Sequence, residues 1–240
     1  MKLISISVSI VLFLSFLPLY ASGTNSINLF QPGTKPYGLT YEEHVENFWK
    51  WALSLPAGKD DHDEFDKNPW NDKTGEDCAS GQLDTNSSVF YLPGNGGYVS
   101  TWTCEVPAGK GLFIPVIVVL ISLPEISSQS IEDLHSLAKK DQDSVKSLYL
   151  KIEDKELLEE DIRKYRVHTG AFDVVYPKYA MFGVTKEGPT KAVGDGYHVI
   201  TEPLTKGNYT IIYKASILCM GADCTEQSFA QDITYKLIVK

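Results

Sequence analysis

The sequence lacks the short motifs that mark several common classes of enzyme. It has no Gly-x-Ser-x-Gly turn of the kind that carries a serine nucleophile. It also has no His-Glu-x-x-His pair, which would place two zinc ligands on one face of a helix. The histidines stand singly along the chain, as His44, His62, His135, His168 and His198. These absences favour a protein without a catalytic centre.

Long apolar runs are scarce after the N-terminal segment. That segment begins with Lys2, continues with an almost unbroken apolar run over residues 3–19, and is followed by the small residues Ala21 and Gly23. This order predicts a secretory signal peptide over residues 1–23. An uncleaved membrane anchor is the alternative, because the run is at the lower limit of what spans a bilayer.

Basic residues are in the minority. The chain has 22 Lys and Arg against 31 Asp and Glu, a formal net charge of −9, which argues against nucleic acid as a partner. Residues 24–240 are enough for one domain with a substantial core. The apolar run at 112–121 is too short to cross a membrane. We therefore expect one secreted or cell-surface domain, with no transmembrane segment in the mature chain.

Cysteine is scarce, and its spacing does not suit a metal site. No two cysteines are arranged as Cys-x-x-Cys, and no histidine is near them in sequence. An even number in an exported chain indicates disulfides. Among three pairings we favour Cys78 with Cys104 and Cys219 with Cys224, because a short polar loop separates the last two.

Two helices are predicted. Thr40 and Glu43 form a capping-box pattern before a segment with apolar residues at helical spacing, and Pro56 ends it. Ser130 begins a second amphipathic segment, which we expect to be an insertion beside the sheets.

The rest of the chain alternates β-type runs with turn residues, which predicts about nine or ten strands. The runs are 89–92, 98–106, 112–123, 149–153, 166–168, 171–176, 181–184, 197–200, 209–213 and 233–239. This number suits two packed antiparallel sheets. We predict a mainly β fold, a two-sheet antiparallel β-sandwich of the jelly-roll or immunoglobulin-like type, with an N-terminal amphipathic helix and one inserted helix.

Residues 59–77 form a long polar loop. Its acidic side chains Asp60, Asp61, Asp63 and Asp66 are hard oxygen ligands of the kind that calcium accepts. Their spacing does not match a calcium-binding loop, because the required glycine and closing glutamate are misplaced. A solvated acidic loop is the alternative, and no other cofactor is predicted.

Tryptophans are the other candidate ligand-binding residues. Trp70 in the polar loop, Trp102 in a β-type run and Trp51 beside the helical stripe have rings that can stack on sugars. Packing in the core is the alternative for each. Asn86 and Asn208 begin Asn-x-Ser/Thr triplets and are candidate glycosylation sites.

Several segments together resemble a known group of proteins. They are the Trp49-Lys50-Trp51-Ala52 sequence in the first helix, the Cys104-Glu105-Val106-Pro107-Ala108-Gly109-Lys110 motif and the closing Asp232-Ile233-Thr234-Tyr235. The combination resembles a family of uncharacterised secreted archaeal and bacterial proteins. The resemblance implies export, one domain and a β-sandwich C-terminal end. It supplies no catalytic residue.

The function predicted first is a non-catalytic extracellular or cell-surface binding or adhesion module, whose partner is a carbohydrate or another surface protein. One alternative is a secreted hydrolase that uses carboxylates of residues 59–77. Another is a calcium-stabilised structural domain of the envelope. An enzyme should place two carboxylates with raised pKa values in a cleft, whereas a binding module should offer an aromatic patch or groove.

Overall fold

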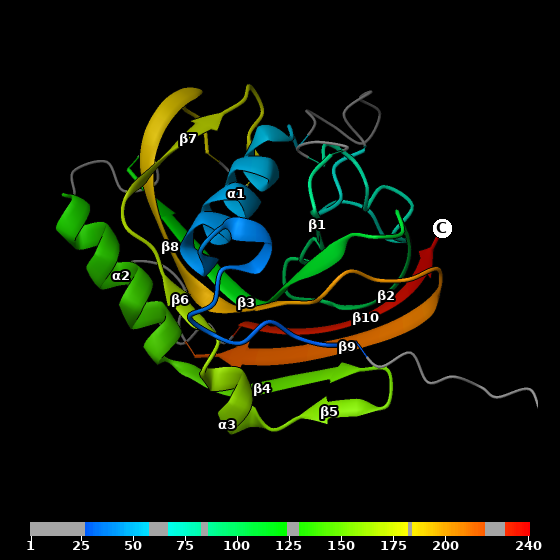
Figure 1. Cartoon of the computed structure of the whole chain (residues 1–240). Coiled ribbons are helices and arrows are strands. Elements are labelled where there is room, and N and C mark those ends of the chain that lie inside the picture. Colours follow the sequence, from blue (N-terminus) through cyan, green and yellow to red (C-terminus); the bar gives the residue numbers. More distant parts are fainter. Residues whose placement is uncertain (1–26, 58–66, 83–85, 124–129, 182–183, 219–228) are drawn as a thin grey trace, which may run out of the picture.

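The computed structural model describes residues 27–57, 67–82, 86–123, 130–181, 184–218 and 229–240. Within these ranges, ten strands form two open five-stranded sheets (Figure 1). The helices are η1 (Pro36–Gly38), α1 (Tyr41–Ser54), α2 (Ile131–Asp143) and α3 (Glu159–Arg163). The predicted mainly β, two-sheet fold with an N-terminal helix and an inserted helix is confirmed. The predicted signal peptide lies outside the described residues.

The first sheet has the order β1-β3-β8-β6, and β7 also pairs with β8. Its strands are β1 (Val89–Tyr91), β3 (Gly111–Ser122), β6 (Arg166–His168), β7 (Phe172–Tyr176) and β8 (Gly188–Ile200). The second sheet has the order β2-β10-β9-β4-β5. Its strands are β2 (Val99–Val106), β4 (Val145–Ile152), β5 (Lys155–Leu157), β9 (Gly207–Ile217) and β10 (Phe229–Val239).

Two strand pairs are parallel rather than antiparallel. They are β1 with β3 and β2 with β10, whereas every other named pair is antiparallel. Parallel pairing requires a long connection, and other strands intervene in sequence in both cases. The predicted antiparallel sandwich therefore holds for most of each sheet but not at these two pairs.

Helix α1 begins with the predicted capping box. The Thr40 hydroxyl accepts a hydrogen bond from the Glu43 backbone N–H, and the Glu43 carboxylate accepts one from the Thr40 N–H. Such a cap typically contributes about 1 kcal/mol. Helix α2 begins with an equivalent box at Ser130 and Asp133. Both helix starts are therefore confirmed at the predicted residues.

The two long helices cover opposite faces of the β3–β8 pair (Figure 1). Helix α1 brings the Trp49 ring against Gly194 of β8. Helix α2 places Leu134 and Ala138 in an apolar cluster with the neighbouring β8 residue, Val193. Successive strand residues point to opposite faces, so Val193 and Gly194 contact different helices. The β3–β8 part of the first sheet is thus covered by a helix on each face.

A disulfide links the residue that follows the polar loop to the second sheet. Cys78 and Cys104 are bonded, with 5.9 Å between their Cα atoms, as predicted. The N–H of Thr103 in β2 also donates to the Thr74 carbonyl at 3.0 Å. Cys219 and Cys224 lie outside the described residues, so their pairing stays a prediction.

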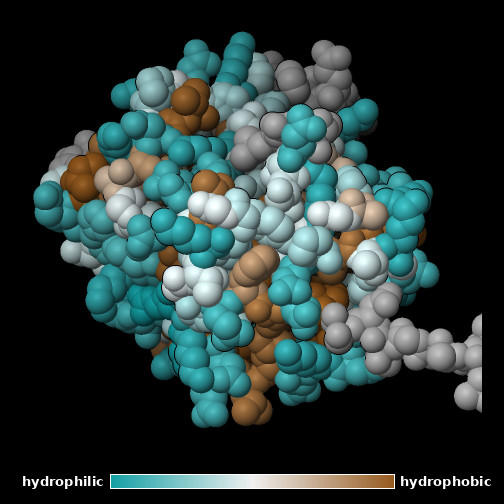
Figure 2. Space-filling view, in the orientation of Figure 1, coloured by the Kyte–Doolittle hydropathy of each residue, from teal (hydrophilic) through white to brown (hydrophobic). Residues whose placement is uncertain are grey.

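The surface is mainly hydrophilic in the view of Figure 2, with hydrophobic side chains gathered in the lower middle, over the second sheet. Among the described helices, none combines the length and apolar character needed to cross a membrane.

Candidate functional site

An apolar cleft of about 340 Å³ lies beside strand β3. Its walls come from α1, β3, β10 and two loop segments. The lining residues are Phe48, Trp49, Trp70, Gly94, Gly96, Pro115, Ile117, Val118, Val119, Leu120, Ile121, Phe229 and Gln231. Gln231 is the one lining residue with a polar aliphatic side chain, and its amide already donates to the Val116 carbonyl. The cleft therefore offers mainly apolar surface, with few hydrogen-bonding side chains.

Among the residues that the structure describes, no strand pairs with one edge of β3 along this cleft. β1 pairs with β3 only over Gly111–Phe113. A bulge between Pro115 and Ile117 follows, and beyond it β8 is the only strand paired with β3 among the described residues.

The direction of the backbone groups on β3 follows from its partner strand. Gly194 of β8 pairs with Leu120, but its N–H donates to Thr169 Oγ1 and its carbonyl accepts from the Thr169 N–H, both at 2.9 Å. In an antiparallel pair, two opposite residues either exchange backbone hydrogen bonds with each other or both point their N–H and C=O groups away from the partner strand. The N–H and C=O of Leu120, and by alternation those of Val118, therefore face the unpaired edge.

The structure separates the three predicted ligand-binding tryptophans. Trp70 is half-buried and lines the cleft, with its ring centroid 5.0 Å from that of Trp51. Trp51 is fully buried, stacks on Tyr91 and donates its Nε1–H to the Ser80 carbonyl at 3.0 Å. Trp102 is 2 % exposed and packs edge-on against Tyr235. Trp51 and Trp102 are thus core residues, and only Trp70 reaches an accessible surface.

The described part of the polar loop uses a carboxylate to build a turn. Asp72 accepts hydrogen bonds from the backbone N–H groups of Thr74 at 2.7 Å and Asp77 at 2.9 Å. Partial burial opposes ionisation, but these bonds prevail and hold the pKa of Asp72 below its usual value. A general acid would need a raised pKa instead. The contacts and the lowered pKa of Asp72 therefore fit a carboxylate that stabilises a turn rather than a general acid.

The remaining predicted site residues fall into two groups. Asp60, Asp61, Asp63 and Asp66 lie outside the described residues, so the calcium site stays a prediction. Within the ranges that the structure describes, no three His, Cys, Asp or Glu side chains are grouped to hold a metal. Asn86 and Asn208 are exposed, and their glycosylation also stays a prediction.

A second depression, of about 700 Å³, lies near the disulfide. It is lined partly by the Glu105–Pro107 segment and by Lys110, and an ion pair between Glu105 and Lys240 lies at it. Among the described residues that line it, Phe90 is the only aromatic one. Glu105 and Lys240 are paired with each other, and the described lining has fewer aromatic residues than that of the apolar cleft, so we favour the apolar cleft as the binding site.

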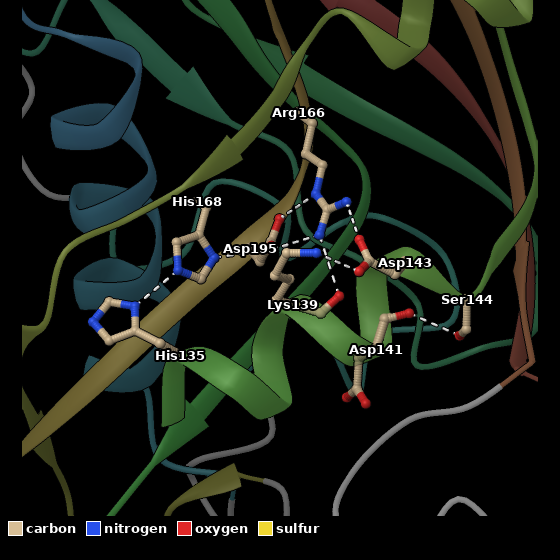
Figure 3. Close-up of polar contacts among 8 residues, drawn as sticks. All are labelled: His135, Lys139, Asp141, Asp143, Ser144, Arg166, His168 and Asp195. Carbon is tan, nitrogen blue, oxygen red and sulfur yellow. Dashed lines mark hydrogen bonds and ion pairs between the residues drawn. The ribbon is translucent and has the colours of Figure 1, made fainter. Parts of the chain in front are cut away.

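A charged cluster joins α2 to the first sheet (Figure 3). Asp195 of β8 is fully buried and accepts two hydrogen bonds from Arg166, at 2.9 Å from Nε and 2.8 Å from Nη2. Arg166 also donates to Asp143 at 2.6 Å. The Asp195 carboxylate, followed by Asp143, raises the pKa of Arg166, while Lys139 and then Arg166 lower the pKa of Asp143. These contacts therefore favour the charged guanidinium of Arg166.

Two histidines extend this cluster to the surface. His168 places Nδ1 2.9 Å from Asp195 Oδ2, and its Nε2 lies 2.8 Å from Nδ1 of His135 on α2. Among the described residues, neither ring has a serine, threonine or cysteine as a hydrogen-bond partner. A nucleophilic triad is thus not formed here by these residues.

The open edge of β3 and the histidine pair were not predicted from the sequence. An open edge depends on where a neighbouring strand stops, and 33 residues separate the two histidines. The sequence holds one signal of the charged cluster. Asp195 stands between two glycines, directly before a β-type run. A charged residue that is buried in a strand requires a partner of opposite charge.

Comparison with known proteins adds little to this picture. No family model matches the chain, and no curated protein matches it. The solved structure of PbICP-C in complex with falcipain-2 is 12 % identical, over 64 % of this chain and 100 % of that one, with a TM-score of 0.23. The solution structure of amebosin is 10 % identical, over 58 % and 97 %, with a TM-score of 0.15. Likenesses this distant carry no argument, and the family resemblance of the motifs stays a prediction.

Proposed function

We propose that this protein is an exported, non-catalytic module that binds an extended segment of another protein in the cleft beside β3. The observation that carries the proposal is the unpaired edge of β3 along an apolar cleft. A segment that adds to this edge would exchange hydrogen bonds with the N–H and C=O groups of Val118 and Leu120. Its alternate side chains would enter the cleft.

The chemistry of the cleft favours a protein segment over a carbohydrate. A sugar needs several polar groups around an aromatic platform to bind its hydroxyls. Trp70 can act as the platform, but Gln231 is already bonded to the Val116 carbonyl. A strand needs only the backbone groups of β3 and apolar surface, and both are present. We therefore expect a partner with apolar residues at alternate positions.

Export is supported by two features. The N-terminal sequence has the order of a signal peptide, and the Cys78–Cys104 disulfide is typical of proteins that fold in oxidising compartments.

The test uses a proline in the edge strand. Because the Val118 N–H faces the unpaired edge, Val118→Pro removes the donor without breaking the β3–β8 ladder. Val118→Thr is the matched control, since it keeps the N–H and the β-branched shape. A panel of short peptides with alternating apolar residues would be titrated against each variant by fluorescence anisotropy, alongside a panel of oligosaccharides.

We expect some apolar peptides to bind the wild type and Val118→Thr with similar affinity, and Val118→Pro at least about tenfold more weakly, as the loss of a net 1.4 kcal/mol would produce. Equal binding of those peptides to all three proteins would refute strand addition. If oligosaccharides bind and quench the Trp70 fluorescence while no peptide binds, the cleft is a sugar site and the proposal is wrong.

A further inference from the structure

We propose that His135 and His168 form a binding site for a divalent transition metal, such as zinc or copper, that ties helix α2 to strand β6. The two rings come from segments far apart in sequence, and one nitrogen of each faces the other across a hydrogen bond (Figure 3). This site is separate from the cleft and does not depend on the function proposed above.

The spacing of the two nitrogens is close to that of two ligands on one metal. Nδ1 of His135 and Nε2 of His168 are 2.8 Å apart. Two imidazole nitrogens at tetrahedral positions on zinc are about 3.3 Å apart, so the rings must separate by about 0.5 Å. The side chain of His168 is 36 % exposed, and both rings are at the surface end of the cluster, so small rotations suffice.

The groups behind His168 fix its ring as the partners of metal-binding histidines do. A ligating histidine almost always gives its other ring nitrogen to a carboxylate or carbonyl, which sets the tautomer and the ring orientation. Here Nδ1 faces the buried carboxylate of Asp195, so Nε2 is the nitrogen directed at His135. Two bonds from Arg166 in turn hold Asp195 in place. The ring of His168 is therefore preorganised.

The local charges indicate which class of ion fits. Asp195 is bonded to Arg166, and Asp143 is bonded to both Arg166 and Lys139. Carboxylates engaged in this way are not free to supply the six or more oxygens that calcium takes. Two imidazole nitrogens suit zinc, copper or nickel, with water at the remaining positions. The site thus differs from the calcium site predicted for residues 59–77.

The test is titration of the folded mature chain with zinc chloride, copper chloride and calcium chloride in separate isothermal titrations. The informative variants are His135→Asn and His168→Gln, whose amides keep a polar contact between α2 and β6 but bind transition metals poorly. Asp173→Asn, an exposed carboxylate of β7, is the control. Histidine ¹⁵N chemical shifts would show which ring nitrogens bind the metal.

We expect one zinc or copper ion to bind the wild type and Asp173→Asn equally, with shifts at Nδ1 of His135 and Nε2 of His168. Either histidine variant should lose this binding. At a hundredfold excess over Kd, the metal should raise the melting temperature of the wild type by about 5 to 10 °C.

Absence of zinc and copper binding to the wild type would overturn the proposal. So would binding that both histidine variants retain, because the metal would then occupy other residues. Calcium binding alone would instead point to the acidic loop. Val118→Pro should bind metal normally, so failure of the cleft proposal and failure of the metal proposal are distinguishable.

Discussion

Acidification should destabilise this protein through one buried histidine. His198 in β8 is fully buried, its ring centroid lies 5.1 Å from that of Phe113, and neither ring nitrogen has a hydrogen-bond partner among the described residues. Burial in this apolar environment lowers the pKa of His198 to about 3. The informative change is His198→Leu, which replaces the imidazole with an apolar side chain that does not titrate.

The sign of the effect follows from proton uptake. An unfolded chain protonates this histidine near pH 6.5, whereas the folded chain does so only near pH 3. Between these values the unfolded state binds more protons, so the free energy of unfolding decreases as the pH falls. At pH 5, which is 1.5 units below the unfolded pKa, His198 should remove about 2 kcal/mol relative to pH 7.

Urea unfolding of both proteins at pH 7 and pH 5 measures this difference. The wild type should lose about 2 kcal/mol more between the two pH values than His198→Leu, because every other titrating group is common to both. Leucine is apolar and of similar size, so the two proteins should unfold with similar slopes. Equal losses would show that His198 is protonated in the folded state near its ordinary pKa, and the reasoning from burial would be refuted.

Three further predictions concern stability, each measured by urea unfolding at neutral pH. Replacing Cys78 and Cys104 together with alanine should cost about 3 to 4 kcal/mol, since their 26-residue separation closes a substantial loop, and a cost under 1 kcal/mol would contradict this. Gly75→Ala should cost about 2 kcal/mol or more, because Gly75 has a φ of 90° and a Cβ would lie 2.7 Å from the Thr103 carbonyl oxygen; an unchanged stability would contradict it. Asp195→Asn should cost about 3 kcal/mol by leaving Arg166 without its buried partner, whereas an unchanged midpoint would show that the pair is not needed.

Much of the fold was predictable because local patterns and tertiary structure agree. The capping boxes at Thr40 and Ser130 mark both helix starts, and alternation marks strands such as β9 and β10, whose inward residues are buried at every second position. Strand β8 was predicted only for residues 197–200, but it begins at Gly188. Its first part contains glycines and Asp195, and tertiary packing rather than β-propensity makes it a strand.

The candidate site was less predictable, for physical reasons. Trp70 was identified because it stands in a polar loop, and the structure places it at the cleft. Trp51 and Trp102 are buried because neighbouring aromatic rings, Tyr91 and Tyr235, cover them, which spacing along one chain does not reveal. The two histidines meet only through the packing of α2 on the sheet.

The position of β10 has a consequence for biosynthesis. This strand follows all the other strands in sequence, yet it lies inside the second sheet, between β9 and β2. Until the ribosome has made Phe229–Val239, both neighbours have an unpaired edge and the sheet cannot close. Pairing so distant in sequence is also slow to form. A nascent chain of this design therefore keeps its second sheet open until the last strand has been made.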